Sequence, residues 1–392
     1  MFLKSNRKVF DKLKIIILAD LKQQQGGTDK VIKHMIKALD NSNHEIIVDY
    51  INKEKYLPKY LPKRWISLFR IFYLHNISKD DYFKQFDIAI TLQPDSHCIK
   101  HKNHIIYFQH HLKQHYDLFW SSFRKRRKLR RKIVFLLVTA ITRLADQIYL
   151  TSNLKKARVI VNSQTVGDRL KKYNKIFKFV IINPPAAPGY IDTIESCKIQ
   201  DTVEACKIQK EQIIIKELAE LSTDRYTILS FSRLNLKEKG IDVILDTALL
   251  MPSYQFIIAG PYDSSLETID ISNMPKNINL MVKDFSEDEK NILFRNCDVF
   301  IAPYLAEDFG ITPIEANFYG KPVVYCDDSG EIIYTQKHKI TGYMSRRNPK
   351  EIFEGIEYCI KNKDKMNDAC IKNALNYTNE KFETSFRKYL LQ

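Results

Sequence analysis

The stretch that decides the fold is CDVFIAPYLAEDFGITPIEANFYGKPVVYCDDSGE, residues 297–331. Its first apolar run ends at Pro303, and a continuous run of this kind is typical of a strand buried on both faces. After a polar loop, Thr312-Pro313 opens a predicted helix with proline at its first position, and Gly320 follows the last turn. A second apolar run comes directly after. The order strand, loop, helix, strand is typical of a parallel α/β sheet.

The same alternation continues on both sides of this stretch. In the first half the strand-like runs are KIIILAD (14–20), HEIIVDYI (44–51), FDIAITL (86–92), HIIYFQH (104–110), RVIVNS (158–163) and FKFVIINPP (177–185). In the second half they are YTILSFSR (226–233), YQFIIAG (254–260), INLMV (278–282), CDVFIAPY (297–304) and PVVYCD (322–327). Helical stretches separate most of them, so the predicted fold class is α/β with two doubly wound domains.

The chain has 392 residues, more than one hydrophobic core normally covers, so two domains are expected. We assign residues 1–190 to the first and 224–374 to the second. Residues 191–223 are predicted to form a linker or insertion, which contains a short duplication, IESCKIQ (from Ile194) and VEACKIQ (from Val203). Residues 375–392 have helical composition, and this helix could cross back to the first domain.

Composition narrows the partners and the compartment. The formal charge is +16, which predicts a polyanionic partner: nucleic acid, anionic lipid or a phosphorylated ligand. Seven scattered cysteines without a C-x-x-C pair indicate free thiols in a reducing compartment and argue against a zinc site. The N-terminus has no long apolar run, and the longest one, Ile133–Thr142, is about half of the ~20 residues that a spanning helix needs. A cytoplasmic protein, soluble or peripheral, is expected.

One segment combines features of a membrane surface contact: DLFWSSFRKRRKLRRKIVFLLVTAITRLAD, residues 117–146. Aromatic residues favour a bilayer interface, and basic residues are attracted to anionic lipid. The predicted membrane-contact residues are Trp120, Arg124, Arg126, Arg127, Arg130 and Arg131. Two alternatives remain for this segment: a nucleic-acid contact, which no recognised module supports, and a buried helix whose basic end is solvated.

Ligands of open parallel sheets bind at the carboxyl ends of the strands, and a cleft between two such domains is where they are expected. Two places there suit anions. Gly26-Gly27 follows the first predicted strand and suits the phosphates of a ligand, although an ordinary turn is the alternative. The start of the helix near Thr312 offers backbone amides to an anion.

The two glutamates Glu307 and Glu315, eight positions apart in EDFGITPIEA, resemble the motif of the family-four retaining glycosyltransferases, especially of bacterial and archaeal mannosyltransferases. Further segments match that family in order. SFSRLNLKEKGID contains Arg233 and Lys239, with Ser232 in place of the usual glycine. The other matching segments are QQQGGTDKV, IIYFQHH, VIINPP, IAGPYD, which keeps one glycine of a usual pair, and KITGYM.

The resemblance implies a fold and a set of roles. The fold is the GT-B type, with two facing Rossmann-like domains, the N-terminal one on the acceptor side, and an interdomain donor cleft. The implied catalytic residues are Arg233, Lys239, Glu307 and His110. The implied donor-binding residues are Gly26, Gly27, Phe309, Gly310, Ile311 and Glu315. Gln109, His111 and Gly260 are further candidates, and either His110 or His111 would serve the reacting sugar. For Glu315 the residues leave an alternative, because Thr312-x-x-Glu315 is also a helix capping pattern.

The implied reaction moves a hexose from a nucleotide-diphosphate sugar to a glycan or to a polyprenyl- or glycolipid-linked acceptor at the inner face of the cell membrane. The resemblance favours mannose and GDP-mannose over a UDP-sugar. No cofactor and no metal are expected, since the chain has no D-x-D triplet and its own cations could stabilise the departing diphosphate. The alternatives are a nucleic-acid-binding protein, and a soluble-acceptor glycosyl synthase or sugar-nucleotide epimerase of the same fold.

Overall fold

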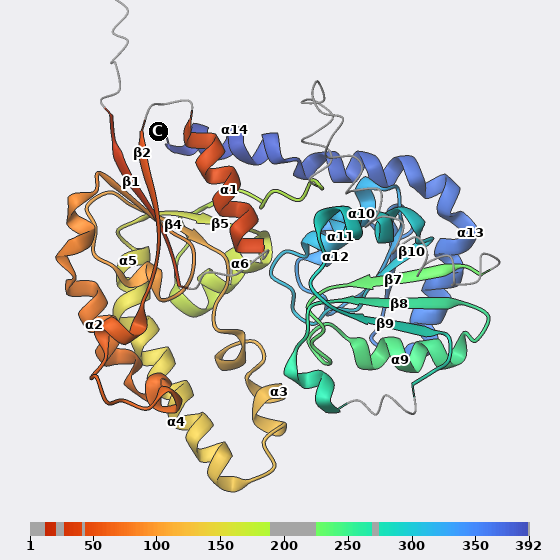
Figure 1. Ribbon diagram of the computed structural model, residues 1–392, viewed down its shortest axis with the longest axis horizontal. Coiled ribbons are helices and arrows are strands. Elements are labelled where there is room, and N and C mark those ends of the chain that lie inside the picture. The colour runs from red at the N-terminus through yellow and green to blue at the C-terminus, as the bar shows by residue number, and fades with distance from the viewer. Residues whose placement is uncertain (1–11, 21–26, 41–43, 189–224, 269–273, 391–392) are drawn as a thin grey trace, which may run out of the picture. The chain divides into compact units, whose positions relative to one another are not determined.

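The structure is a computed structural model that describes residues 12–20, 27–40, 44–188, 225–268 and 274–390. The chain divides into two compact units, one made of Met1–Asn183 with Phe382–Gln392 and the other of Pro184–Lys381 (Figure 1). The predicted boundary of the first domain was residue 190, and the predicted return of the chain began at residue 375. The duplication at 194–209 and most of the predicted linker lie outside the described residues.

The first unit is built on a parallel sheet with strand order β2-β1-β3-β4-β5-β6. Its strands are β1 (Lys14–Ala19), β2 (Glu45–Tyr50), β3 (Ile88–Thr91), β4 (His104–Phe108), β5 (Arg158–Val161) and β6 (Val180–Ile181). Register follows the apolar runs, with Ile16 opposite Ile47 on β2 and opposite Ala89 on β3. The central strands are buried on both faces, which explains why their sequences are continuously apolar.

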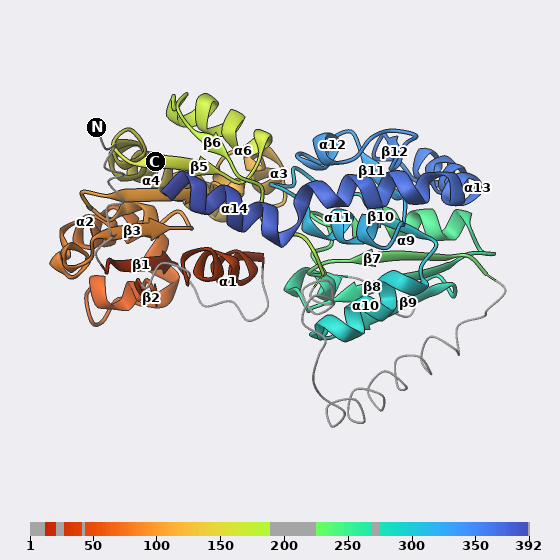
Figure 2. The ribbon, with the colours of Figure 1, turned by 90° about the horizontal axis from the view of Figure 1, so that it is seen from above.

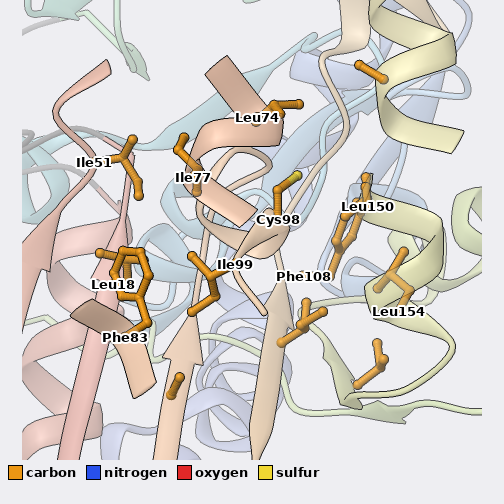
Figure 3. Packing of buried hydrophobic residues seen from close by; sticks show 14 of the residues in the cluster. Leu18, Ile51, Leu74, Ile77, Phe83, Cys98, Ile99, Phe108, Leu150 and Leu154 are labelled. Atoms are coloured by element: carbon orange, nitrogen blue, oxygen red, sulfur yellow. The ribbon is translucent and has the colours of Figure 1, made fainter. Parts of the chain in front are cut away.

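Helices cover both faces of this sheet. They are α1 (Gly27–Asp40), α2 (Arg70–Lys79), α3 (Phe119–Arg124), α4 (Leu129–Ala145), α5 (Thr151–Leu154), α6 (Gln164–Arg169) and α14 (Asn379–Leu390). On one face α2, the end of α4, α5 and α6 enclose a core that includes Leu18, Leu74, Phe108 and Leu154 (Figure 3). On the other face α1 and α14 pack over Ile15, Ile17 and Tyr107.

The last helix, α14, completes the first unit although it comes from the end of the chain. Phe382 and Phe386 are buried in the core beside α1. His34 Nδ1 lies 2.7 Å from Glu383 Oε1, and Arg387 Nε donates a hydrogen bond to the Ala38 carbonyl oxygen at 2.9 Å. Figure 2 shows α14 in blue next to the strands of this unit. The C-terminal helix therefore belongs to the core of the first unit.

The second unit repeats the architecture with strand order β12-β11-β10-β7-β8-β9, again all parallel. Its strands are β7 (Thr227–Phe231), β8 (Gln255–Gly260), β9 (Ile278–Val282), β10 (Val299–Ala302), β11 (Val323–Cys326) and β12 (Gly342–Ser345). Its helices are α9 (Ile241–Leu250), α10 (Glu287–Asn296), α11 (Ile311–Phe318), α12 (Ile332–Thr335) and α13 (Pro349–Ala374).

Successive side chains of these strands face opposite layers. Ile228 packs toward α9 and α13, whereas Leu229, the next residue, packs toward α10, α11 and α12. Both units are therefore sheets with helices on both faces. The prediction of an α/β chain with two doubly wound domains is confirmed.

The apolar stretch of the first unit is longer as a helix than as a sequence run. The helix continues from Leu129 to Leu154, through a π-helical turn at Asp146–Leu150, and is long and apolar enough to cross a membrane by length and composition. The expectation of a segment too short to span was wrong, because the helix extends beyond the run Ile133–Thr142 at both ends. Helices packed in the core of a soluble protein can have the same length and composition. About a third of the most apolar part of this helix is buried.

Candidate functional site

The candidate residues of the second unit lie in loops at the carboxyl ends of neighbouring strands. Arg233 and Lys239 follow β7, Gly260 ends β8, and Glu307 and Gly310 follow β10. The strands β10, β7 and β8 are adjacent and parallel, so these loops leave the same edge of the sheet. This is the edge at which parallel sheets bind ligands.

Lys239 and Glu307 form an ion pair at this edge. The Lys239 ammonium lies 2.5 Å from Glu307 Oε2, and each side chain is 18% exposed. The same ammonium lies 4.3 Å from the centroid of the Tyr304 ring. Tyr304 is buried, and its hydroxyl donates to the Phe231 carbonyl at 3.0 Å. The structure therefore brings together two of the predicted catalytic residues, on an aromatic support that connects β10 to β7.

The backbone explains why the Lys239 loop reaches Glu307. Gly240 has a φ of +64°, and a Cβ there would lie 2.2 Å from the Pro303 carbonyl oxygen. Only glycine permits that contact without displacing the backbone. Next to it, the Leu305 amide donates to the Glu238 carbonyl at 2.8 Å, which ties the β10 loop to the β7 loop.

A second glycine holds Glu307 from the other side. Gly330, with a φ of +65°, would place a Cβ 2.3 Å from the Glu307 carbonyl oxygen. The Glu331 amide donates to that oxygen at 3.0 Å. Ala306, just before the glutamate, has a positive φ of 50°, which is strained for a residue with a side chain. The position of Glu307 is therefore set by the backbone of two loops.

The start of α11 differs from the prediction. The helix begins at Ile311, with Gly310 at the N-cap position, so Pro313 is its third residue and not its first. Proline is tolerated throughout the first turn, because the amides there have no partner within the helix. The Phe309 side chain is buried in a core cluster, which leaves only its backbone for a ligand.

The predicted capping alternative for Glu315 was wrong. The N-cap of α11 is Gly310 and not Thr312, and the Thr312 hydroxyl lies 3.1 Å from the Tyr304 hydroxyl instead. Glu315 is 2% exposed, and its Oε1 accepts a hydrogen bond from the Lys290 ammonium at 3.0 Å. The structural partner of Glu315 is therefore a buried lysine on α10.

Lys290 is the residue that sequence reasoning missed. It also donates to Glu287 at 2.8 Å. Burial by itself would lower the pKa of Lys290, but the charges of Glu315 and Glu287 raise it above its ordinary value. The lysine therefore stays charged. A lysine in the polar stretch SEDEKN gives no sequence signal of burial.

Arg233 lies apart from the Lys239 pair. Its side chain is 59% exposed, and its Nε is 3.7 Å from Asp263 on the loop after β8. Gly260, at the end of β8, contacts the Ser232 backbone so closely that a Cβ would lie 1.9 Å from the Ser232 carbonyl oxygen. Gly260 therefore maintains the packing of the β8 end against the segment that carries Arg233.

The first unit has its own group at a strand end. Gln109 follows β4, and the Thr28 hydroxyl donates to Gln109 Oε1 at 2.9 Å. Gly27 is the first residue of α1, next to Thr28. Gly26 lies outside the described residues. The structure thus brings Gly27 close to the segment after β4, with Thr28 as a contact that the prediction did not include.

The two histidines after β4 differ in environment. His111 is buried, and its Nε2 lies 2.7 Å from Asn174 Oδ1, within a group of aromatic rings. Burial lowers the pKa of His111. His110 is partly exposed, and its Nδ1 lies 3.1 Å from the His111 carbonyl oxygen. These environments make His111 a packing residue and leave His110 as the one that a ligand can reach.

The predicted membrane-contact residues lie on α3, on the turn after it and on the first turn of α4. Trp120 is 65% exposed. Arg126 is partly buried, and its guanidinium lies 3.8 Å from the centroid of the Phe135 ring. Arg124, Arg127, Arg130 and Arg131 are exposed. The segment therefore presents cations and apolar side chains on the same surface.

The edge of the second sheet therefore holds carboxylates, cations and loops whose conformation requires glycine. This arrangement suits a ligand that carries both phosphate and hydroxyl groups. Within the described ranges, no group of three or more His, Cys, Asp or Glu residues is arranged to hold a metal ion.

Comparison with known proteins supports this interpretation. Residues 211–377 match the family described as "Glycosyl transferases group 1". Over 141 residues the chain is 29% identical to the O-antigen biosynthesis glycosyltransferase WclY of Escherichia coli, a match that covers 35% of this chain and 38% of that protein. Over 115 residues it is 28% identical to the human alpha-1,3/1,6-mannosyltransferase ALG2, covering 27% of each. The chain thus matches well under two thirds of the length of these relatives.

Solved structures match nearly the whole chain in fold. The sucrose-phosphate synthase of Thermosynechococcus elongatus superposes with a TM-score of 0.67 at 13% identity, covering 97% of this chain and 99% of that one. The Anabaena protein HepE, in complex with UDP and glucose, has a TM-score of 0.62 at 13% identity, with 96% and 99% covered. Identities this low establish the fold alone. The chain therefore has the two-Rossmann-domain, GT-B fold, and its residues 211–377 match the glycosyl transferases group 1 family.

Proposed function

We propose that the protein is a retaining glycosyltransferase that moves a hexose, preferably mannose, from a nucleotide-diphosphate sugar to a glycan or lipid-linked glycan at the cytoplasmic face of a membrane. One observation carries the proposal. The cation of Lys239 and the carboxylate of Glu307 meet at the strand ends of a domain that matches the group 1 family.

In the proposed reaction, the cations of the site stabilise the departing diphosphate. The bond from the anomeric carbon to the diphosphate breaks, and the diphosphate keeps the electron pair. Negative charge grows on it in the transition state, where a fixed cation contributes most. Lys239 is held by Glu307 and Tyr304, and Arg233 supplies a second, more exposed cation. The HepE complex with UDP and glucose supports a nucleotide and a sugar as ligands of this fold.

We assign the other roles on the same basis. Glu307 faces the donor sugar, with backbone amides of Phe309, Gly310 and Ile311 near its hydroxyls, and Glu315 binds the donor ribose. The acceptor hydroxyl forms the new bond on the face that the diphosphate leaves, and its proton passes to the departing phosphate, with His110 assisting. Because Glu315 is buried against Lys290, a pair of carboxylates acting as in glycoside hydrolases is not proposed.

The preference for mannose, and so for GDP-mannose, rests on the resemblance of EDFGITPIEA to mannosyltransferases and on the similarity to ALG2, a mannosyltransferase. The name of WclY supports a role in glycan biosynthesis. No metal is proposed for the reaction, since the cations of the chain itself can bind the diphosphate.

The membrane part of the proposal rests on the helix that begins at Leu129. Its buried side chains, Phe135, Thr139, Thr142 and Ala145, recur every three to four residues and so lie on one face. Apolar side chains of the remaining surface are exposed: Leu129, Ile133, Val134, Leu136, Leu137 and Leu144. A helix that packs one face on its own unit suits a position in the plane of the interface, with the arginines against anionic lipid.

Lys239→Gln should lower turnover by about a hundredfold or more, the scale expected when one donor to the transition-state charge is lost. The assay is transfer from a panel of nucleotide sugars, with GDP-mannose expected to be the best donor. The matched control is Lys237→Gln, which removes the same charge from the same loop, where Lys237 is 56% exposed and paired with Asp242. Equal turnover in both variants would contradict the role of Lys239.

Glu315→Gln should both destabilise the fold and weaken donor binding. Removing one partner of a buried ion pair costs about 3–5 kcal/mol, and Glu287 should offset part of this for Lys290. The double variant Lys290→Met/Glu315→Gln removes both charges and should regain part of the lost stability in denaturant unfolding. Donor binding should stay weak in the double variant. Wild-type donor affinity there would leave Glu315 with a structural role alone.

EDTA should leave the rate of transfer unchanged. The reason is that the proposed counter-charges of the diphosphate, Lys239 and Arg233, are side chains. The measurement is turnover after dialysis against EDTA, with and without added magnesium or manganese. Loss of activity that either metal restores would show that a cation from solution performs this task.

The protein should sediment with anionic vesicles, more at higher anionic content and less at high salt. A variant with Arg126, Arg127, Arg130 and Arg131 changed to Glu should lose this binding. The control makes the same change in charge on the second unit, at the exposed residues Lys350, Lys361, Lys365 and Lys372. If wild type ignores anionic vesicles, or if both variants lose binding equally, the membrane contact is wrong and a soluble acceptor becomes the better proposal.

A further inference from the structure

The first unit contains a cavity of about 590 Å³ beside the turn from α3 to α4. Its cationic wall consists of Arg126, Lys128, Arg130 and Arg131. These residues were expected to form a general basic surface. The structure instead arranges them around one hollow, so the attraction of this segment for anions is concentrated at a site.

The cavity has no internal counter-charge. None of its lining residues is acidic. None of these four cations forms an ion pair with a carboxylate in the part of the chain that the structure describes. Four like charges around one cavity repel one another, and an anion placed among them removes that repulsion. Burial lowers the pKa of Arg126, which adds to the advantage of a bound anion.

The opposite wall is polar and neutral. His115 is 3% exposed, with Nδ1 2.8 Å from the Thr139 hydroxyl and Nε2 3.2 Å from Gln114 Nε2. Burial, together with the charges of Arg70, Arg126 and Arg143, lowers the pKa of His115 to about 4. The imidazole is therefore neutral at neutral pH. Both of its ring nitrogens already have partners, so the charge of a bound ligand must be balanced by the arginines and Lys128.

The remaining wall is apolar. Val134, Phe135 and Val138 line it. Outside the cavity, Ile133 and Leu137 of the same helix are exposed. A ligand that fills the cavity and continues along α4 therefore needs an anionic end and an apolar chain. Arginine guanidinium groups match the oxygens of a phosphate with two parallel hydrogen bonds, which favours phosphate over a simple carboxylate.

We propose that this cavity binds the phosphate monoester or diphosphate head of a membrane lipid, with the head among the four cations and the chain along the exposed apolar side of α4. Under the proposed function such a lipid would be the carrier of the acceptor, and that identification rests on the proposed function. The binding of the lipid head does not depend on the proposed function, because the residues that line the cavity take no part in donor chemistry.

The test measures binding to vesicles of matched surface potential, without any donor present. One set carries phosphatidic acid, a phosphate monoester, and the other carries phosphatidylglycerol, a phosphodiester. The lining variant is Arg130→Gln/Arg131→Gln. The control, Arg124→Gln/Arg127→Gln, removes two exposed charges of the same basic run that do not line the cavity. All four positions are exposed, so both variants should fold, which unfolding midpoints will check.

Wild type should prefer the monoester vesicles by about tenfold or more, the equivalent of one lost charge-assisted hydrogen bond. The control should bind both vesicles more weakly but keep this preference, whereas the lining variant should lose it. A wild-type preference near one, or equal loss of preference in both variants, would overturn the proposal. Inorganic diphosphate should release the protein from the vesicles more than sodium chloride of equal ionic strength does, and equal release would overturn phosphate recognition. If free diphosphate binds the protein as tightly as the vesicles do, the lipid part of the proposal is overturned.

These outcomes are separate from those of the proposed function. Vesicle preference can be present in a protein that transfers no sugar. Transfer to a soluble acceptor can also persist in the lining variant, which leaves Lys239 and Glu307 unchanged.

Discussion

The close approach of the Gly240 backbone to the Pro303 carbonyl is the contact on which the site of the second unit depends. Neighbouring parallel strands place the β7 and β10 loops side by side, but only a residue without a Cβ lets them touch. The hydrogen bond from Leu305 to Glu238 then closes the junction. Lys239 and Glu307 face each other because both loops are fixed in this way. Their geometry is a property of the backbone, so the charges can be altered without moving it.

Much of this fold could be predicted because buried parallel strands have continuously apolar sequences. The run Val299–Ala302 is continuously apolar since helices cover both sides of its sheet. The family resemblance gave Lys239 and Glu307 separate roles, whereas their ion pair depends on β7 and β10 being neighbours in the sheet, which the structure shows. The first residue of α11 could not be predicted as well. Proline fits several positions of a first turn, and the positive φ of Gly310 is not visible in a sequence.

The features that sequence reasoning missed all depend on contacts between distant residues. Lys290 on α10 is paired with Glu315 on α11, a helix on the same face of the sheet, whereas its neighbours in sequence are polar. The difference between His110 and His111 comes from Asn174, 63 positions away on a π-helical turn. In the helix from Leu129, Asp146 is buried and pairs with Arg70 on α2 at 3.0 Å, a contact 76 positions away in the sequence. A pattern of neighbouring residues contains none of this information.

The packing of α14 on the first unit has a consequence for biosynthesis. The last strand of that sheet is β6. The apolar face that Phe382 and Phe386 cover is completed only by α14, which is synthesised roughly 200 residues later. At about 5–20 residues per second, the ribosome needs on the order of 10–40 s to supply it. During that interval the second unit is being synthesised, while the first lacks the helix that covers its apolar face beside α1. The unit made first is therefore the one finished last, and the nascent chain needs protection from aggregation there.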